Sequence, residues 1–141
     1  MKKALVQAKK AYDNQEVPIG AVIVVDNKVV AKAYNKRNAS KNATHHAEIM
    51  AIAKACKALG DWRLENAELY VTLMPCPMCA GAIVNARIKK VFFGADNGNR
   101  EIFEKIMQES ELNHKTEFEG GVLAEECSNL LKSFFASKRN K

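Results

Sequence analysis

Apolar and polar residues follow one another along the chain in segments that predict helices and strands in turn. Residues 2–13 place apolar side chains at the three-and-four spacing of an amphipathic helix. The apolar run from Gly20 to Val25 predicts a buried strand, and a turn at Asp26-Asn27-Lys28 predicts that Val29 to Tyr34 returns beside it. Residues 35–44 are mostly polar and predict a loop.

The second part of the chain continues the alternation. The pattern predicts a helix from His46 to Leu59, with Thr44 as its N-cap and Gly60 as its C-terminal stop. The further predicted elements are a strand at Leu69–Leu73, a helix at Cys79–Val84, a strand at Val91–Gly94, a helix at 101–108, an edge strand at Phe118 and a closing helix at Val122–Phe135. Strands that alternate with helices indicate an α/β fold with helices packed on a sheet. Since no linker or repeat divides the 141 residues, we expect a single domain, 1–141.

Charge is distributed unevenly, although the net value is only +6. Residues 1–41 hold nine basic and three acidic side chains, and the last ten residues hold Lys132, Lys138, Arg139 and Lys141 with no acid. Basic ends suit a polyanionic substrate, but they equally suit a solvated surface that keeps a protein in solution. No apolar run approaches the roughly 20 residues of a membrane span, and no signal-peptide core follows the N-terminus, so we expect a cytoplasmic protein without a membrane partner.

Two short motifs carry candidate chemistry: His46-Ala47-Glu48 and Pro75-Cys76-Pro77-Met78-Cys79. One imidazole and two thiolates are ligands for Zn²⁺, and three protein ligands leave the fourth tetrahedral position open for water, as in catalytic sites. Both motifs lie where a predicted helix begins, and the partial positive charge there lowers the pKa of a thiol. Glu48 is expected to move the protons of that water rather than to bind the metal.

Each of these residues also has a simpler interpretation. The Cys76–Cys79 pair alone could be a redox pair, and a structural zinc site would want a fourth ligand, for which His45 is the obvious candidate. Consecutive helical residues point about 100° apart, however, so we expect His45 to be exposed or to line the pocket. His114 is expected at the surface or in a hydrogen bond, and Cys56 and Cys127 as small buried apolar residues.

Several motifs are spread over nearly the whole chain: 16–22 (Glu-Val-Pro-Ile-Gly-Ala-Val), 46–51, 70–73, 75–83, 121–127 and Phe134-Phe135 before the basic tail. Together they resemble the bacterial tRNA-specific adenosine deaminases. The zinc motif alone is shared by all cytidine-deaminase-like enzymes, whereas the opening strand and the closing helix point to the tRNA branch.

The resemblance implies a three-layer α/β/α cytidine-deaminase-like fold with a central five-stranded mixed sheet flanked by helices. It implies a homodimer with one Zn²⁺ per subunit, held by His46, Cys76 and Cys79, and proton transfer by Glu48. The implied reaction is hydrolytic conversion of adenosine to inosine at the wobble position, on a tRNA anticodon stem-loop.

The resemblance also implies substrate contacts. Asn35 would hydrogen-bond the flipped base, since an amide both donates and accepts, although an asparagine at a strand end can equally be an ordinary loop residue. Lys36-Arg37 and the basic C-terminal tail would meet phosphates. The other implied substrate contacts are Ala47 and the pocket wall of Pro18, Ile19, Gly20 and Ala21.

Two departures from the family pattern favour a second hypothesis, a deaminase of free nucleobases or nucleosides of the guanine or cytosine type. Met74 stands where the family has glutamate, and residues 96–103 replace a loop rich in glycine and alanine. A third hypothesis is a zinc-stabilised binding module without activity. Glu48 argues against it, because a structural zinc site has no use for that carboxylate.

Overall fold

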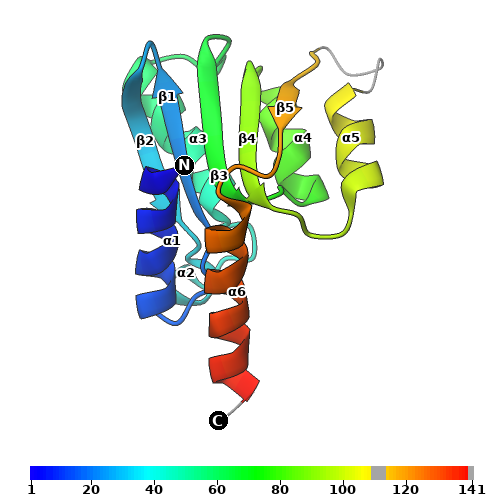
Figure 1. Ribbon diagram of the computed structural model, residues 1–141. Helices are drawn as coiled ribbons and strands as arrows, with labels where there is room; N and C mark the ends of the chain where they lie inside the picture. Colours follow the sequence, from blue (N-terminus) through cyan, green and yellow to red (C-terminus); the bar gives the residue numbers. More distant parts are fainter. Residues whose placement is uncertain (109–113, 140–141) are drawn as a thin grey trace.

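A mixed five-stranded sheet in the order β2-β1-β3-β4-β5 is the centre of the protein in the computed structural model, which describes residues 1–108 and 114–139 (Figure 1). β1 pairs antiparallel with both β2 and β3, whereas β4 runs parallel to β3 and to β5. The predicted mixed sheet is therefore confirmed. The strands are β1 (Gly20–Val25), β2 (Lys28–Tyr34), β3 (Ala67–Leu73), β4 (Lys90–Ala95) and β5 (Glu117–Glu119).

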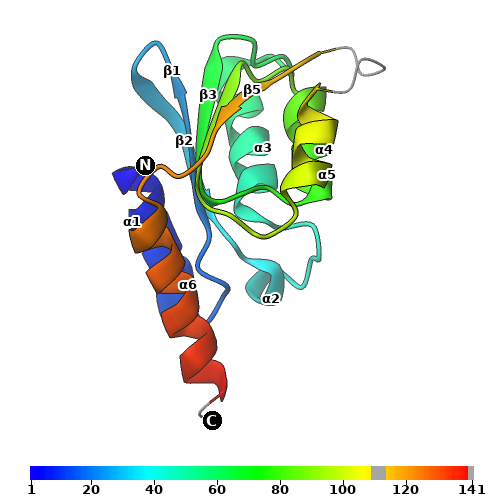
Figure 2. The same cartoon turned by 45° about the vertical axis from the view of Figure 1, so that its right-hand side comes forward.

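Helices cover both faces of this sheet, which gives the three predicted layers (Figure 2). The helices on one face are α1 (Lys2–Asp13) and α6 (Ala124–Arg139), and those on the other are α3 (Ala47–Leu59), α4 (Pro77–Asn85) and α5 (Arg100–Gln108). The short helix α2 (Arg37–Ser40) lies in the connection between β2 and α3. No described helix has both the length and the apolar character needed to cross a membrane.

The main apolar core lies between the sheet and the layer formed by α3, α4 and α5. Leu69 and Val71 alternate along β3 with partly exposed residues, and both are fully buried. Phe93 of β4 meets Phe103 of α5 edge to face, with ring centroids 5.3 Å apart. Edge-to-face contact is a favoured geometry for aromatic pairs, so this contact helps to hold α5 against the sheet.

The structure corrects three predictions about secondary structure, while the ends of the other elements agree with the predicted ones within two residues. α3 begins at Ala47 with His46 as its N-cap, so the prediction of Thr44 as N-cap is wrong: the Thr44 hydroxyl instead donates to Asn42 Oδ1 at 2.7 Å. The expected loop at 35–44 contains α2. The closing helix begins two residues later than predicted, because Leu123 has a left-handed backbone with a φ of 54°, and it continues to Arg139.

Helix α1 rests directly on the first residue of β1. A Cβ atom at Gly20 would collide with the backbone of Ala4 and Ala8 in α1. Backbone cannot move aside as a flexible side chain can, so only glycine lets α1 come this close to the sheet.

We expect Gly20→Ala to destabilise the fold by about 1–3 kcal/mol through overpacking against α1. Such a loss corresponds to roughly 2–4 °C of melting temperature per kcal/mol for a domain of this size. Gly81→Ala in α4 is the matched control, because nothing outside its own helix lies within 4 Å of the added methyl group. The free energy of unfolding of that control should rise by up to about 1 kcal/mol, because alanine has a higher helix propensity than glycine. Urea and thermal unfolding measure both, and an unchanged Gly20→Ala variant would contradict the close contact.

Candidate active site

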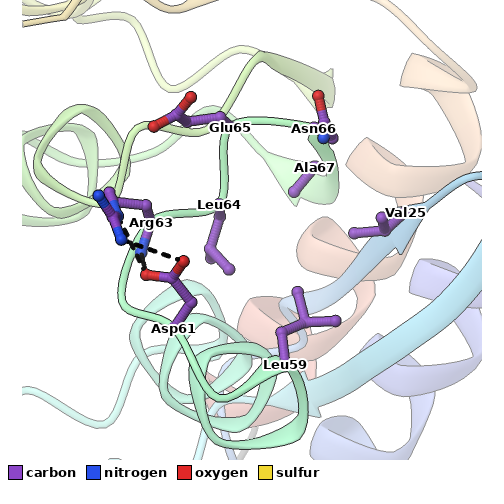
Figure 3. A pocket seen from close by; sticks show the side chains of 8 residues that line it. All are labelled: Val25, Leu59, Asp61, Arg63, Leu64, Glu65, Asn66 and Ala67. Carbon is purple, nitrogen blue, oxygen red and sulfur yellow. Dashed lines mark hydrogen bonds and ion pairs between the residues drawn. The ribbon is translucent and has the colours of Figure 1, made fainter.

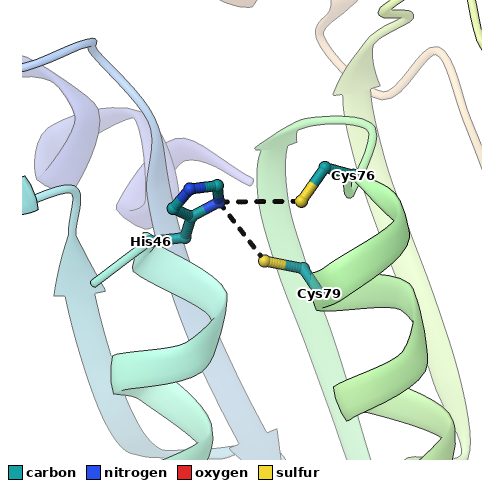
Figure 4. Close-up of side chains that lie close together, drawn as sticks. All are labelled: His46, Cys76 and Cys79. Carbon is teal, nitrogen blue, oxygen red and sulfur yellow. Dashed lines mark hydrogen bonds between the residues drawn. The ribbon is translucent and has the colours of Figure 1, made fainter. Parts of the chain in front are cut away.

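The first turns of α3 and α4 bring one imidazole and two thiols together (Figure 4). His46 is the N-cap of α3, Cys76 is the N-cap of α4, and Cys79 lies one turn further along α4. His46 Nδ1 is 3.7 Å from Cys76 Sγ and 3.5 Å from Cys79 Sγ. Zinc–sulfur bonds of about 2.3 Å and zinc–nitrogen bonds of about 2.0 Å place tetrahedral ligand atoms about 3.5 Å apart, so this group fits one metal ion.

No fourth ligand joins the group among the described residues. The possible ligand atoms of His46, Cys76 and Cys79 lie within 4.8 Å of one another, and the described histidine, cysteine and acidic side chains add none to them. His45 instead places its Nε2 3.1 Å from Asn42 Nδ2. Three protein ligands are the arrangement of catalytic zinc sites, which keep a fourth position for water or substrate.

The two thiols differ in their affinity for a proton. A hydrogen bond from the Cys79 thiol lowers the pKa of Cys76 to about 5, helped by backbone N–H groups of the helix start and by His46. The same hydrogen bond, together with burial, raises the pKa of Cys79. The two sulfurs share one proton more readily than they lose both, because two adjacent thiolates would repel each other. A metal ion has to displace that proton, since both cysteines bind as thiolates.

Glu48 is the second residue of α3, in its first turn, and its side chain is buried with only 4% of the residue exposed. Burial raises the pKa of its carboxyl group to about 7, and the negative charge of Cys76 acts in the same direction, while hydrogen bonds from its own backbone and from Cys79 oppose them. Oxygen Oε1 has no hydrogen-bond partner among the described residues. A buried acceptor without a donor costs stability, so this oxygen is a candidate for a water or substrate contact.

Asn35 joins the start of α3 to the segment that precedes β1. Its Oδ1 accepts a hydrogen bond from Ala47 N at 2.8 Å, and its backbone N–H donates to Ile19 O at 3.1 Å. Since Oδ1 is engaged, the amide nitrogen of this buried side chain is the part that can serve a ligand, as a donor.

The other predicted substrate contacts lie close to this junction. Pro18, Gly20, Ala21 and Ala47 are buried, whereas Ile19 is half-buried. The backbone N–H of Ala47 is used by Asn35, and Ala21 is enclosed between β2 and β3. Their roles in substrate binding stay predictions.

The two departures from the family pattern, Met74 and residues 96–103, meet in the structure. Met74, between β3 and α4, is 1% exposed and belongs to the apolar core. Its backbone donates to Ala95 O at 2.8 Å and accepts from Asn97 Nδ2 at 3.2 Å. Sequence reasoning missed this anchoring role of Asn97, which fixes the segment that leads into Pro75-Cys76.

Four further predictions concern histidine and cysteine side chains outside the group. His114 Nε2 lies 2.8 Å from Ile88 O, which confirms its hydrogen-bonded role. Cys127 is 1% exposed, as expected of a small apolar residue, whereas Cys56 is only half-buried. His45, also half-buried, is neither fully exposed nor a member of the ligand group.

A separate pocket of about 360 Å³ lies at the opposite end of α3 (Figure 3). It is bordered by Leu59, the last residue of α3, and by an ion pair of 3.2 Å between Arg63 Nε and Asp61 Oδ1. The 13 residues of α3 span about 20 Å, so this pocket is remote from His46.

The three-layer fold and the His-Cys-Cys group beside a buried glutamate define the class of cytidine-deaminase-like enzymes. The family model described as MafB19-like deaminase matches residues 1–139. The tRNA-specific adenosine deaminase of Bacillus subtilis (strain 168) is 49% identical over 144 residues, which cover 100% of this chain and 89% of that relative.

Two solved structures extend the comparison. One comes from a study of A-to-I editing by tRNA:A34 deaminases at the wobble position of transfer RNA; it has a TM-score of 0.88 and 40% identity, and covers 93% of this chain and 97% of that one. The guanine deaminase of Bacillus subtilis has a TM-score of 0.66 and 35% identity, and covers 99% of this chain and 91% of that one. The chain belongs to the family of tRNA-specific adenosine deaminases.

We expect Cys76→Ser and Cys79→Ser to lose the metal, from about one ion per chain to nearly none, because a serine hydroxyl does not replace a thiolate ligand. Cys56→Ser is the matched control, since this half-buried thiol lies outside the ligand group. Elemental analysis of the three purified variants measures the number of metal ions per chain. Full loading of Cys79→Ser would contradict the assignment of the group as the metal site.

Proposed function

We propose that the protein is a zinc-dependent hydrolytic deaminase that converts adenosine to inosine at the wobble position of a tRNA anticodon. The observation that carries this proposal is the set of three ligands beside a buried carboxylate whose Oε1 has no partner among the described residues. The family supports tRNA as substrate, because the relatives are named for that activity.

The reaction replaces the exocyclic amine of adenine by an oxygen from water. His46, Cys76 and Cys79 would hold the zinc ion, which would supply the Lewis acidity that makes water a nucleophile near neutral pH. Glu48 accepts a proton from the attacking water and delivers one to the ring nitrogen beside the reacting carbon. Glu48 then passes the proton of the newly bound hydroxyl group to the amine, the carbon–nitrogen bond breaks as the carbonyl forms, and ammonia leaves. General acid–base help of this kind contributes roughly 10²–10⁴ in rate.

Asn35 is proposed to hold the flipped base in place. The Ala47 N–H fixes the orientation of its amide group, so Nδ2 is presented as a donor. An adenosine has to leave the base stack to reach such a site, and contacts of this kind offset the cost of unstacking. The half-buried Ile19 is proposed to contact the base from the pocket wall.

Basic side chains on two elements are proposed to bind the RNA backbone. Arg37 is exposed in α2, and Lys132, Lys138 and Arg139 are exposed on α6. The end of α6 extends past the sheet (Figure 1), where it can reach a bound nucleic acid. Lys141 of the basic tail lies outside the described residues.

The assembly and location of the protein are proposed from the family resemblance. We propose a homodimer with one zinc ion per subunit, acting in the cytoplasm where tRNA is processed. Met78 of α4 and Ile102 of α5 are exposed apolar side chains on the helix layer that carries the metal ligands, and a second copy could cover them.

A deaminase of free guanine is the second candidate function. The observation that favours it is the similarity to the Bacillus subtilis guanine deaminase across 99% of this chain. The lower TM-score of that structure, 0.66 against 0.88, favours the tRNA substrate.

We expect the zinc-loaded protein to form inosine in an anticodon stem-loop and to release no ammonia from guanine. The value of kcat/KM should fall on the order of tenfold or more between 50 and 200 mM salt, because several phosphate contacts release counterions. Mass spectrometry of the RNA and an ammonia assay measure the two reactions. Product from guanine alone, with little dependence on salt, would establish the second candidate instead.

We expect Glu48→Gln to keep its zinc and to lose turnover by roughly 10²–10⁴ or more. The same change should raise the melting temperature, because a neutral amide replaces a buried carboxylate oxygen that lacks a donor. Glu65→Gln, at an exposed glutamate of the remote pocket, is the matched control and should change neither property. Loss of zinc from Glu48→Gln would show that the carboxylate supports the metal site, and retention of activity would show that it does not transfer the protons.

A further inference from the structure

Glu16 is a second buried carboxylate, and it is the opposite of Glu48 in its hydrogen bonding. The residue is 2% exposed and lies in the connection between α1 and β1, two positions before Pro18. Its Oε1 accepts from Asn38 N at 3.1 Å and its Oε2 accepts from Ala39 N at 2.8 Å. Charged side chains are rarely buried without partners, so both oxygens are committed to these two backbone groups.

These two donors belong to the first turn of α2. A helix of four residues is far too short to be stable by itself, and the N–H groups of its first turn have no acceptors within the helix. A carboxylate at that end satisfies two of them and interacts favourably with the partial positive charge. Glu16 therefore holds the only regular structure that the connection from β2 to α3 contains among its described residues.

The segment held in this way is strongly basic. Residues 35–46 contain Lys36, Arg37 and Lys41 and no aspartate or glutamate. Arg37 and Lys41 are exposed, and Lys36 Nζ lies 4.8 Å from the centre of the Tyr34 ring. Because Glu16 is buried and bonded to the backbone, it fixes the segment without pairing with these cations.

Hydrogen bonds also attach the segment at its base, next to the metal ligands. Lys36 N donates to His45 O at 3.1 Å, which closes residues 36–45 into a loop directly before His46. Asn35 ties the same base to Ile19 and Ala47. Figure 2 shows α2 standing apart from both helix layers. The two hydrogen bonds to Glu16 therefore join the outer part of the loop to the segment that leads into the proposed pocket wall.

We propose that Glu16 is a positioning residue for tRNA: its carboxylate holds residues 36–41 where Lys36, Arg37 and Lys41 meet phosphates of the anticodon stem-loop. A segment fixed before binding loses less conformational freedom when the RNA binds, which strengthens the complex. This inference rests on the proposed function and adds to it the residue that organises the RNA contact. Glu16 acts on binding alone, because it touches neither the metal ligands nor Glu48.

Glu16→Gln tests the proposal, because it keeps the size of the side chain but removes its charge and one of its two acceptors. We expect KM for the stem-loop to rise about tenfold, the effect of losing a charged hydrogen bond. The dependence of kcat/KM on salt should become shallower, since fewer phosphates are held. Zinc content and kcat at saturating RNA should stay within about twofold of those of the unaltered protein.

Thr116→Val is the matched control for a lost buried hydrogen bond. Thr116 is 2% exposed, and its Oγ1 donates to Ile88 O at 2.9 Å, near β5 at the far edge of the sheet. This variant should lose stability without any change in KM or in the salt dependence. Glu16→Asp keeps the charge on a shorter side chain, and its KM should lie between those of the unaltered protein and Glu16→Gln.

Hydrogen exchange in the unaltered protein tests the same contact without any substitution. The amides of Asn38 and Ala39 should be protected, although both residues are exposed. Exchange at the rate of free amides would overturn the proposal, even if Glu16→Gln fails to fold.

The outcomes separate this proposal from the proposed function. If the unaltered protein is active on the stem-loop and Glu16→Gln has the same KM and salt dependence, the positioning role is wrong. A loss of kcat with unchanged KM also overturns it, because Glu16 would then act on the chemistry. If the unaltered protein forms no inosine in RNA, the proposed function fails, and the RNA-binding role of Glu16 fails with it.

Discussion

The side-by-side packing of α3 and α4 on one face of the sheet sets the distances on which the metal site depends. Both helices follow strands or loops that end near the same edge, so His46 and Cys76 meet as the N-caps of neighbouring helices. The buried face of α3 is made of Ala47, Ala51 and Ala55, each fully buried. α3 packs mainly against β1 and β2, so these small side chains let the helix lie close to the sheet, and longer ones would move the helix that carries His46.

The two buried carboxylates, Glu16 and Glu48, serve different purposes: one stabilises the fold, and the other is available for chemistry. Glu16 satisfies both oxygens with backbone N–H groups, so its charge stabilises a loop. Glu48 leaves one oxygen without a donor among the described residues and carries a raised pKa, so its burial costs stability. That cost is understandable only if the oxygen serves a molecule that the folded chain itself does not contain.

Features fixed by residues close together in the sequence could be predicted, whereas those fixed by distant residues could not. His46, Cys76 and Cys79 could be predicted because short motifs mark both helix starts, and the chemistry of the ligands requires that they meet. The short helix α2 could not be predicted, since its stability depends on hydrogen bonds from Glu16, more than twenty positions away. Thr44 was predicted as an N-cap from its type and position, but the local acceptor of Asn42 engages its hydroxyl group.

The close approach of α6 to β4 near one end of the helix determines where the other end lies. A Cβ atom at Gly94 would collide with Cys127 near the start of α6. The direction of the helix is therefore set at that end by a close contact that leaves no room for another atom. Over 16 residues, about 24 Å, a tilt of roughly 5° there displaces the far end by about 2 Å. Further along α6, the edge-to-face contact of Tyr12 with Phe134 holds the helix against α1. Small changes in side-chain volume beside Gly94 would thus shift the basic side chains at the C-terminal end of α6 while the metal ligands stay in place.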